Sequence, residues 1–434
     1  MSATPESTTT AGEAAGDGRL YRRLWRWHFY AAFLVIPFVL LQSLTGTLYL
    51  WHDEWADWAH PELRFVEPKA QRASLDAQLS AALTAHPEAQ ATTLIVPAEP
   101  TRATQVMFGG HHGEGDGLPF PVFVNPYSGE VLGSLPDWSW MPGWSREIHG
   151  GWPLGDAGSW LLELGACWAV VMVLTGLYLW WPGDRGLLAA LVPRTGQGAR
   201  VLVRDLHASV AVLFSALLLA FLISALPWTH FWGNQVLKPL QGALGQSSPF
   251  GAAMRAESSP VTDGAAITLD EALQRARAAG VDGDVEIKLD GRPGSALSLR
   301  NRMPRAAQET QLALDRGNGT VLVKTTWDDY PPIPRAVSVG VDLHEGSFFG
   351  RANQWFNTVF ALALVWISAT GFLSWWLRRP RGKLGAPLRA EIRLPRWALA
   401  TGAALCVVMP LLGASVLALW LCDRVGAGAR IARG

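Results

Sequence analysis

Five long apolar runs constrain this chain most, because each is long enough to cross a membrane as a helix. A hydrocarbon core of about 30 Å needs about 20 mostly apolar residues. The runs predict membrane helices at residues 19–52, 151–182, 207–229, 351–378 and 397–422. Tryptophan and tyrosine gather at their ends, as in YLWHDEW, LYLWWPGD and SWWLRRP, where aromatic rings lie at headgroup level. The sequence therefore predicts a mainly α-helical membrane protein of about five transmembrane helices.

The composition agrees with a membrane protein and argues against a nucleic-acid-binding protein. The chain has 434 residues, of which only 17% are charged, and 22 are tryptophan. This profile is typical of a protein whose partner is the lipid bilayer. Its 36 basic and 36 acidic residues balance, which argues against nucleic acid as a partner. The three cysteines, Cys167, Cys406 and Cys422, all lie within predicted membrane helices, so no disulfide framework is expected outside them.

Basic residues set the predicted orientation, because short cytoplasmic segments are rich in lysine and arginine. Arginine clusters precede the first predicted helix, separate the second from the third and follow the fourth. Residues 1–18 then form a disordered cytoplasmic tail, and residues 183–206 and 379–396 form cytoplasmic loops. The long segments 53–150 and 230–350 lie outside, as does the tail 423–434, although Arg424, Arg430 and Arg433 oppose that last placement.

An internal repeat relates the two halves of the chain. Counted from His149, offsets of 6, 11, 26, 27, 31 and 32 residues give Gly, Trp, Thr, Gly, Trp and Trp, and the same offsets from His344 give the same residue types. The first and third predicted membrane helices also open on a histidine each, His28 and His207. Because the two halves run in the same direction, the repeat predicts pseudo-twofold symmetry about an axis along the membrane normal.

The outer segments repeat as well. VNPYSGEVLGS and LDRGNGTVLVK place Asn125 and Asp315 four residues before a glycine, which predicts a tight turn between two short strands. LDAQLSAALTAHP and TLDEALQRARAAG, which precede them, have helical apolar spacing, with Asp76 or Thr268 near the start as a possible cap. We therefore expect two α+β modules outside the membrane.

Six of the ten histidines lie at the ends of predicted membrane helices. They are His28 and His207 on the cytoplasmic side and His52, His149, His230 and His344 on the outer side. A single histidine at the lipid interface is usually only an amphipathic residue. Under the predicted symmetry, however, His28 faces His207 and His149 faces His344, and two imidazoles are the axial ligands of a low-spin b-type haem. His52 and His230 are alternative haem ligands. A zinc or copper ion is the alternative to haem as the group that these histidines bind.

Other polar residues are candidates for a substrate or proton path. Glu163 lies inside the second predicted membrane helix, where a carboxylate is costly. Arg146 lies three residues before His149, and His111 and His112 lie in the loop HHGEGDG. Glycines that follow a threonine, at positions 46, 176 and 371, are expected to give a flat macrocycle room between helices.

With the motifs LHASV, IHGGWPLG, DLHEGSFFG and TGLYLWWPG, the sequence resembles the PepSY-associated transmembrane family over nearly all of residues 19–379. It is most similar to the siderophore-reductase branch, whose FoxB-type members are bacterial inner-membrane proteins with two b-type haems. The resemblance implies two PepSY-like periplasmic modules. It also implies an oxidoreductase that takes electrons from a quinol or a cytoplasmic reductant and reduces a ferric siderophore, or another ferric chelate, to release Fe(II).

Two functions of other classes stay open at this point. PepSY modules also inhibit proteases, so the chain is alternatively a non-redox regulator whose outer modules bind a peptide. A transporter of the ferric chelate is the second alternative, although Glu163 is nearly the only charge within the predicted helices.

Overall fold

The computed structural model describes residues 9–109, 118–182, 186–249, 251–259, 266–289, 294–389 and 393–431. The chain forms two compact units, each built from separate stretches of sequence. The helical unit comprises Met1–Leu44, Asp156–Val236 and Val359–Gly434, and the sheet unit comprises Thr45–Gly155 and Leu237–Thr358. The two units are treated separately below.

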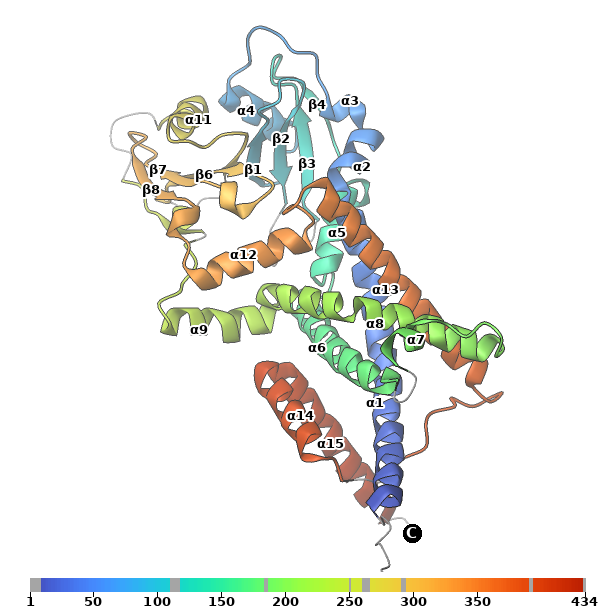
Figure 1. The fold of residues 1–434 in the computed structure, drawn as a ribbon. Helices are drawn as coiled ribbons and strands as arrows, with labels where there is room; N and C mark the ends of the chain where they lie inside the picture. The colour runs from blue at the N-terminus through green and yellow to red at the C-terminus, as the bar shows by residue number, and fades with distance from the viewer. Residues whose placement is uncertain are drawn as a thin grey trace, which may run out of the picture. The chain divides into compact units, whose positions relative to one another are not determined.

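Long apolar helices make up most of the helical unit (Figure 1). Its helices are α1 (Thr9–Leu50), α6 (Gly155–Trp180), α7 (Leu187–Leu191), α8 (Ala199–Ala225), α13 (Arg351–Arg378), α14 (Arg396–Val408) and α15 (Pro410–Ile431), of which α1, α6 and α13 also contribute residues to the sheet unit. Within the described residues, four helical stretches are long and apolar enough to cross a membrane: Gly18–Leu50, Gly155–Trp180, Ala199–Trp228 and Arg351–Arg378. They confirm the first four predicted membrane helices.

The fifth predicted membrane helix is a bent pair instead of one straight helix. α14 and the first part of α15, Pro410–Val425, meet at an angle of 120°. Pro410 explains the break, because a proline has no backbone N–H to continue a helix. The Arg389 Nη2 atom, before α14, lies 3.5 Å from Asp423 Oδ2, near the end of α15. The pair therefore folds back on itself, and its two ends lie close together.

One antiparallel sheet of eight strands forms the core of the sheet unit. The strands are β1 (Ala91–Val96), β2 (Thr104–Phe108), β3 (Phe120–Val124), β4 (Val131–Ser134), β5 (Asp284–Lys288), β6 (Leu297–Arg302), β7 (Gln311–Leu314) and β8 (Val321–Thr325). Their order is β4-β3-β2-β1-β5-β6-β7-β8. β1 pairs with β5, so the two predicted α+β modules share a single sheet. The pairing satisfies two strand edges that separate modules would leave open.

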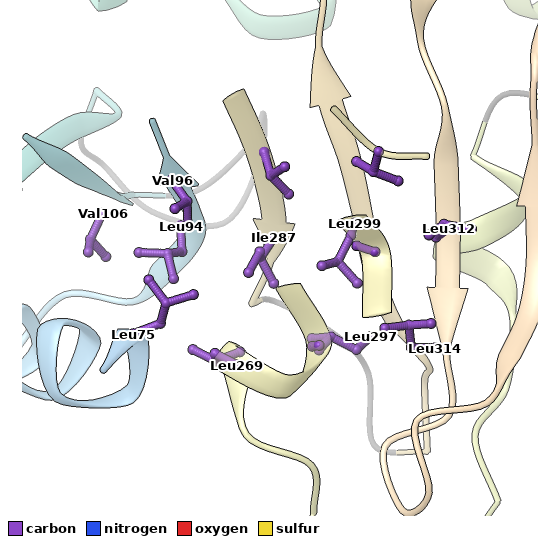
Figure 2. Close-up of a cluster of buried hydrophobic side chains, with 14 of the residues drawn as sticks. Leu75, Leu94, Val96, Val106, Leu269, Ile287, Leu297, Leu299, Leu312 and Leu314 are labelled. Carbon is purple, nitrogen blue, oxygen red and sulfur yellow. The ribbon is translucent and has the colours of Figure 1, made fainter. Parts of the chain in front are cut away.

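Helices complete the sheet unit. They are α2 (His52–Ala59), α3 (Pro61–Arg64), α4 (Leu75–Ala85), α5 (Met141–Gly150), α9 (Lys238–Ala243), α10 (Ala252–Arg255), α11 (Leu269–Ala278) and α12 (Pro332–His344). α4 and α11 pack on the sheet through an apolar cluster that includes Leu75, Leu94, Leu269 and Ile287 (Figure 2).

Reciprocal capping joins the two halves of the sheet unit. The Asp76 carboxylate on α4 accepts a hydrogen bond of 3.0 Å from the Leu269 N–H at the start of α11. In return, Asp270 accepts one of 2.8 Å from the Leu75 N–H at the start of α4. The predicted cap Thr268 forms a capping box at the start of its own helix, α11. The predicted cap Asp76, which lies on α4, also caps α11 rather than its own helix. Corresponding residues of the two repeats thus make equivalent hydrogen bonds to each other's helix.

Both predicted turns are confirmed. The Asn125 Oδ1 atom accepts the Tyr127 N–H at 2.9 Å between β3 and β4, and Asp315 Oδ1 accepts the Gly317 N–H at 2.9 Å between β7 and β8. The glycines that close the turns have φ angles of 73° and 70°, in the left-handed region.

Candidate functional site

His149 and His344 meet at the ends of two helices of the sheet unit. His149 is the penultimate residue of α5, which stops at Gly151 with a φ of 116°, and His344 is the last residue of α12. Their ring centroids lie 6.3 Å apart, with the ring planes at 71° to each other. The structure therefore brings together the outer pair that the repeat predicts.

That separation leaves room for a metal ion between the two rings. A metal–imidazole nitrogen bond of about 2.0–2.1 Å, with about 1.1 Å from the nitrogen to the ring centre, puts two axial imidazole centroids about 6.2–6.4 Å apart. Two rings that pack edge to face without an intervening atom lie about 4.5–7 Å apart, so direct packing also accounts for this separation. The distance is therefore compatible with two imidazoles that share a metal, and equally with an edge-to-face ring contact.

Protonation also suits ligation at the outer pair. Burial lowers the pKa of His344 to about 4, and burial together with the neighbouring His344 lowers the pKa of His149 to about 4. Both rings are therefore neutral at pH 7, and each has one unprotonated nitrogen. A neutral imidazole is the form that binds a metal.

Thr45 and Gly46, near the end of α1, hold the His149 ring in place. The Thr45 hydroxyl lies 3.0 Å from His149 Nδ1, at hydrogen-bond distance. A Cβ at Gly46 would lie only 3.0 Å from His149 Cε1. Residue 46 therefore has to be glycine for the ring to occupy this position.

The two histidines of the predicted inner pair lie within the helical unit, and each ring has a hydrogen-bond partner on another helix. His28 Nδ1 lies 3.1 Å from the Thr175 hydroxyl, whose own proton goes to the Val171 carbonyl at 2.8 Å. The Thr175 oxygen therefore accepts from the His28 Nδ1–H, which leaves Nε2 unprotonated. His207 Nδ1 donates to the Ile367 carbonyl at 2.9 Å, with the same result. Second partners of this kind fix the ring of a ligating histidine.

Glycines pack against the inner rings as well. A Cβ at Gly176 would lie 3.2 Å from His28 Cε1, and one at Gly371 would lie 3.1 Å from His207 Cε1. The sequence prediction assigned the three glycines the task of making room for a macrocycle. In the structure, each one makes room for an imidazole ring.

The alternates His52 and His230 have carboxylate neighbours. His52 donates from Nδ1 to the Tyr49 carbonyl at 2.7 Å and lies 3.4 Å from an Asp53 oxygen. His230 Nδ1 lies 3.2 Å from Asp156 Oδ1. The structure joins neither of these rings to a second imidazole.

The remaining candidates are dispersed. Arg146 is exposed on α5, one turn before His149, and Glu163 is fully buried in α6. His111 and His112 lie outside the described residues. Across the part of the chain that the structure describes, no group of three or more His, Cys, Asp or Glu residues is able to hold a metal ion. The paired imidazoles are thus the candidate ligands.

The threonine partners were missed by sequence reasoning. Thr45 and Thr175 each precede one of the glycines, so a Thr-Gly pair in a membrane helix was the available signal. Which ring each pair contacts depends on packing between helices distant in the sequence.

A comparison with protein-family models matches residues 25–378 to the PepSY-associated TM region. No curated protein matches the chain.

Proposed function

We propose, from the premise that the chain belongs to the PepSY-associated TM region family, that it is an inner-membrane electron-transfer protein with two b-type haems. In this proposal it reduces a ferric siderophore, or another ferric chelate, on the periplasmic side. One observation carries the proposal: the 6.3 Å between the ring centroids of His149 and His344. This distance would allow both imidazoles to bind one metal.

Haem is favoured over a bare metal ion by the donor set. Structural zinc takes four protein ligands and catalytic zinc takes three, whereas each candidate centre here offers two imidazoles. A haem needs only two axial ligands, because its macrocycle supplies the other four. The residues present therefore fit this group, with His149 and His344 for the outer haem and His28 and His207 for the inner one.

When bound, a haem supplies a centre that gains and loses one electron reversibly. The chain's own residues hold that centre rigid. Thr45, Thr175 and the Ile367 carbonyl orient the rings, and Gly46, Gly176 and Gly371 let the rings approach the helices. Rigid ligands keep the reorganisation on electron transfer small, because neither oxidation state requires the side chains to move.

Reduction suits the release of iron from a chelate. Ferric iron is a small, hard cation that oxygen chelators hold tightly, and one added electron gives Fe(II), which the same oxygens bind more weakly. The reaction breaks no covalent bond and needs neither a nucleophile nor a general acid. Exposed Arg146, one turn from His149, is available to contact an anionic chelate.

The alternatives leave the histidine contacts without a purpose. A peptide-binding regulator needs the sheet and an anchor, and a ferric-chelate carrier needs a path for the whole chelate. Neither function requires three histidine rings, each lying against a glycine, within the described helices. The dihaem proposal uses all three.

Absorption spectroscopy followed by a turnover assay tests the proposal. The purified protein is expected to show a Soret band and, after dithionite reduction, the sharp α-band of a bis-imidazole b-type haem. Adding a ferric chelate to the reduced protein without oxygen should restore the oxidised spectrum while Fe(II) accumulates in a colorimetric trap. A colourless protein, or a reduced protein that ferric chelates do not reoxidise, would refute the proposal.

A further inference from the structure

Glu163 is a buried carboxylate that the proposed electron path does not use. It lies on α6 within a membrane-spanning stretch, and its side chain is 0% exposed. Its Oε2 atom accepts the Trp232 backbone N–H at 3.0 Å, whereas its Oε1 atom has no hydrogen-bond partner. A buried oxygen without a donor is costly, so a hydrogen-bond donor on a bound molecule would stabilise this atom.

The surroundings of Glu163 are apolar and unusually shaped. Trp232 is the first residue of a π-helical turn, Trp232–Leu237, a rare conformation that is frequent at functional sites. The Trp232 indole N–H donates to the Val408 carbonyl at 2.9 Å, where α14 ends and the bent pair turns back. Trp232 thus contacts Glu163 through its backbone and the tip of the bent pair through its side chain.

The nearby core limits the chemistry of a ligand. One turn further along α6, Cys167 and Val170 pack with Met409 and Leu412 of the bent pair. None of the ion pairs found among the described residues involves Glu163. A ligand here has to be largely apolar and to offer a hydroxyl donor rather than a positive charge.

Polar residues continue from Glu163 along one side of α6 towards its exposed start. Asp156, Ser159 and Glu163 lie at i, i+3 and i+7 on α6, which places them on one side of the helix. Ser159 accepts the His230 backbone N–H at 3.1 Å, and the His230 ring lies 3.2 Å from Asp156. The Asp156 side chain is 79% exposed. Polar side chains therefore lie on the Glu163 side of α6 between this carboxylate and the exposed start of the helix.

We infer that Glu163 is the proton acceptor of a quinol-binding site in the helical unit. The inference rests on the proposed function, for which it names the electron donor. A membrane quinol combines an apolar body with two hydroxyl donors. The quinol gives two electrons to two ferric haems and two protons to the protein, and it leaves as the quinone. The first proton goes to Glu163 Oε1, and both protons leave to water at the exposed Asp156 end of α6.

The test measures reduction of the haem-loaded protein by a short-chain quinol, followed by stopped-flow absorbance without oxygen. Glu163→Gln keeps the size of the side chain and removes the base, and we expect it to slow quinol-dependent reduction by about a hundredfold. Leu161→Ala, two residues away on the same helix at a side chain that is 49% exposed, is the matched control and should reduce at the wild-type rate. Both variants should still be reduced fully by dithionite. Wild-type quinol kinetics in Glu163→Gln would overturn the inference.

A second measurement does not depend on haem. Photolabelling with an azidoquinone, followed by peptide mapping, should mark residues of α6 or the tip of the bent pair, and Glu163→Gln should lose most of this label. Label distributed evenly over lipid-facing helices, or unchanged in the variant, overturns the quinol site. A protein without haem that is still labelled at Glu163 would instead refute the dihaem proposal alone.

Discussion

Gly46→Ala is the perturbation whose effect on the outer centre follows most directly from the structure. The added Cβ would lie 3.0 Å from His149 Cε1 and 3.5 Å from Nδ1. An ordinary carbon–carbon contact begins at about 3.5 Å, so the ring has to retreat by about half an ångström. A metal–nitrogen bond tolerates only about 0.2 Å of displacement. The variant should therefore lose axial ligation at His149 while the helix itself gains stability from alanine.

The expected magnitude is a loss of outer-haem affinity of about 10–100-fold, the usual effect of disturbing a residue that supports a ligand. Haem titration of the apoprotein, followed through the Soret band, measures it for each centre. Gly150→Ala is the matched control, because this glycine adjoins His149 on α5 and a Cβ there would meet nothing within 4 Å. The control should bind two haems as tightly as the wild type.

The refuting outcome is equally specific. If Gly46→Ala binds the outer haem with wild-type affinity and an unchanged bis-imidazole spectrum, His149 is not an axial ligand in the position that the structure gives it. Loss of both haems in this variant would show that the two centres do not bind haem independently.

Three further predictions concern a ligand partner, a titrating group and the bent pair. Thr175→Val removes the acceptor of the His28 Nδ1–H, a hydrogen bond worth about 1 kcal/mol. Redox titration should therefore show the midpoint potential of the inner haem raised by about 40 mV. An unchanged potential would contradict that hydrogen bond. Burial raises the pKa of Glu309 to about 7 from its ordinary 4.5, so the protonated form stabilises the fold. This contribution is complete below pH 4.5 and is lost as the pH rises through about 7. Thermal unfolding should therefore show a fall in melting temperature over this range that Glu309→Gln reduces, and an identical pH profile in the variant would oppose the assignment. Exposed Cys422 adjoins Asp423, which lies near Arg389 in the predicted cytoplasmic loop. In a protein carrying Cys167→Ala and Cys406→Ala, an impermeant maleimide should therefore label Cys422 from the cytoplasmic side only. Labelling from the outer side would contradict the fold-back of the bent pair.

Local sequence patterns predicted much of the fold. Apolar length identified the first four membrane helices, since a helix that crosses a bilayer must satisfy its backbone internally over a fixed distance. The Asn125 and Asp315 turns were predictable because the side chain and the glycine act within a few residues. The histidine pairs followed from the repeat, and the structure brings His149 and His344 together.

Other features depended on contacts between residues far apart in the sequence. The pairing of β1 with β5 joins segments almost 200 residues apart, and nothing in either strand specifies its partner. Pro410 was visible within the fifth apolar run, but the fold-back also involves the contact between Arg389 and Asp423. The sequence predicted that Gly46, Gly176 and Gly371 leave space between helices. Only the packed helices show that histidine rings occupy this space.

The haem content of the wild type and of His344→Ala tests the central claim most directly. The pyridine haemochrome assay, with protein quantified by amino-acid analysis, should give two b-type haems per wild-type chain and one per variant chain, and the remaining haem should keep its bis-imidazole spectrum. A wild-type protein without haem, or a variant that keeps both, would contradict the claim that His149 and His344 share a haem.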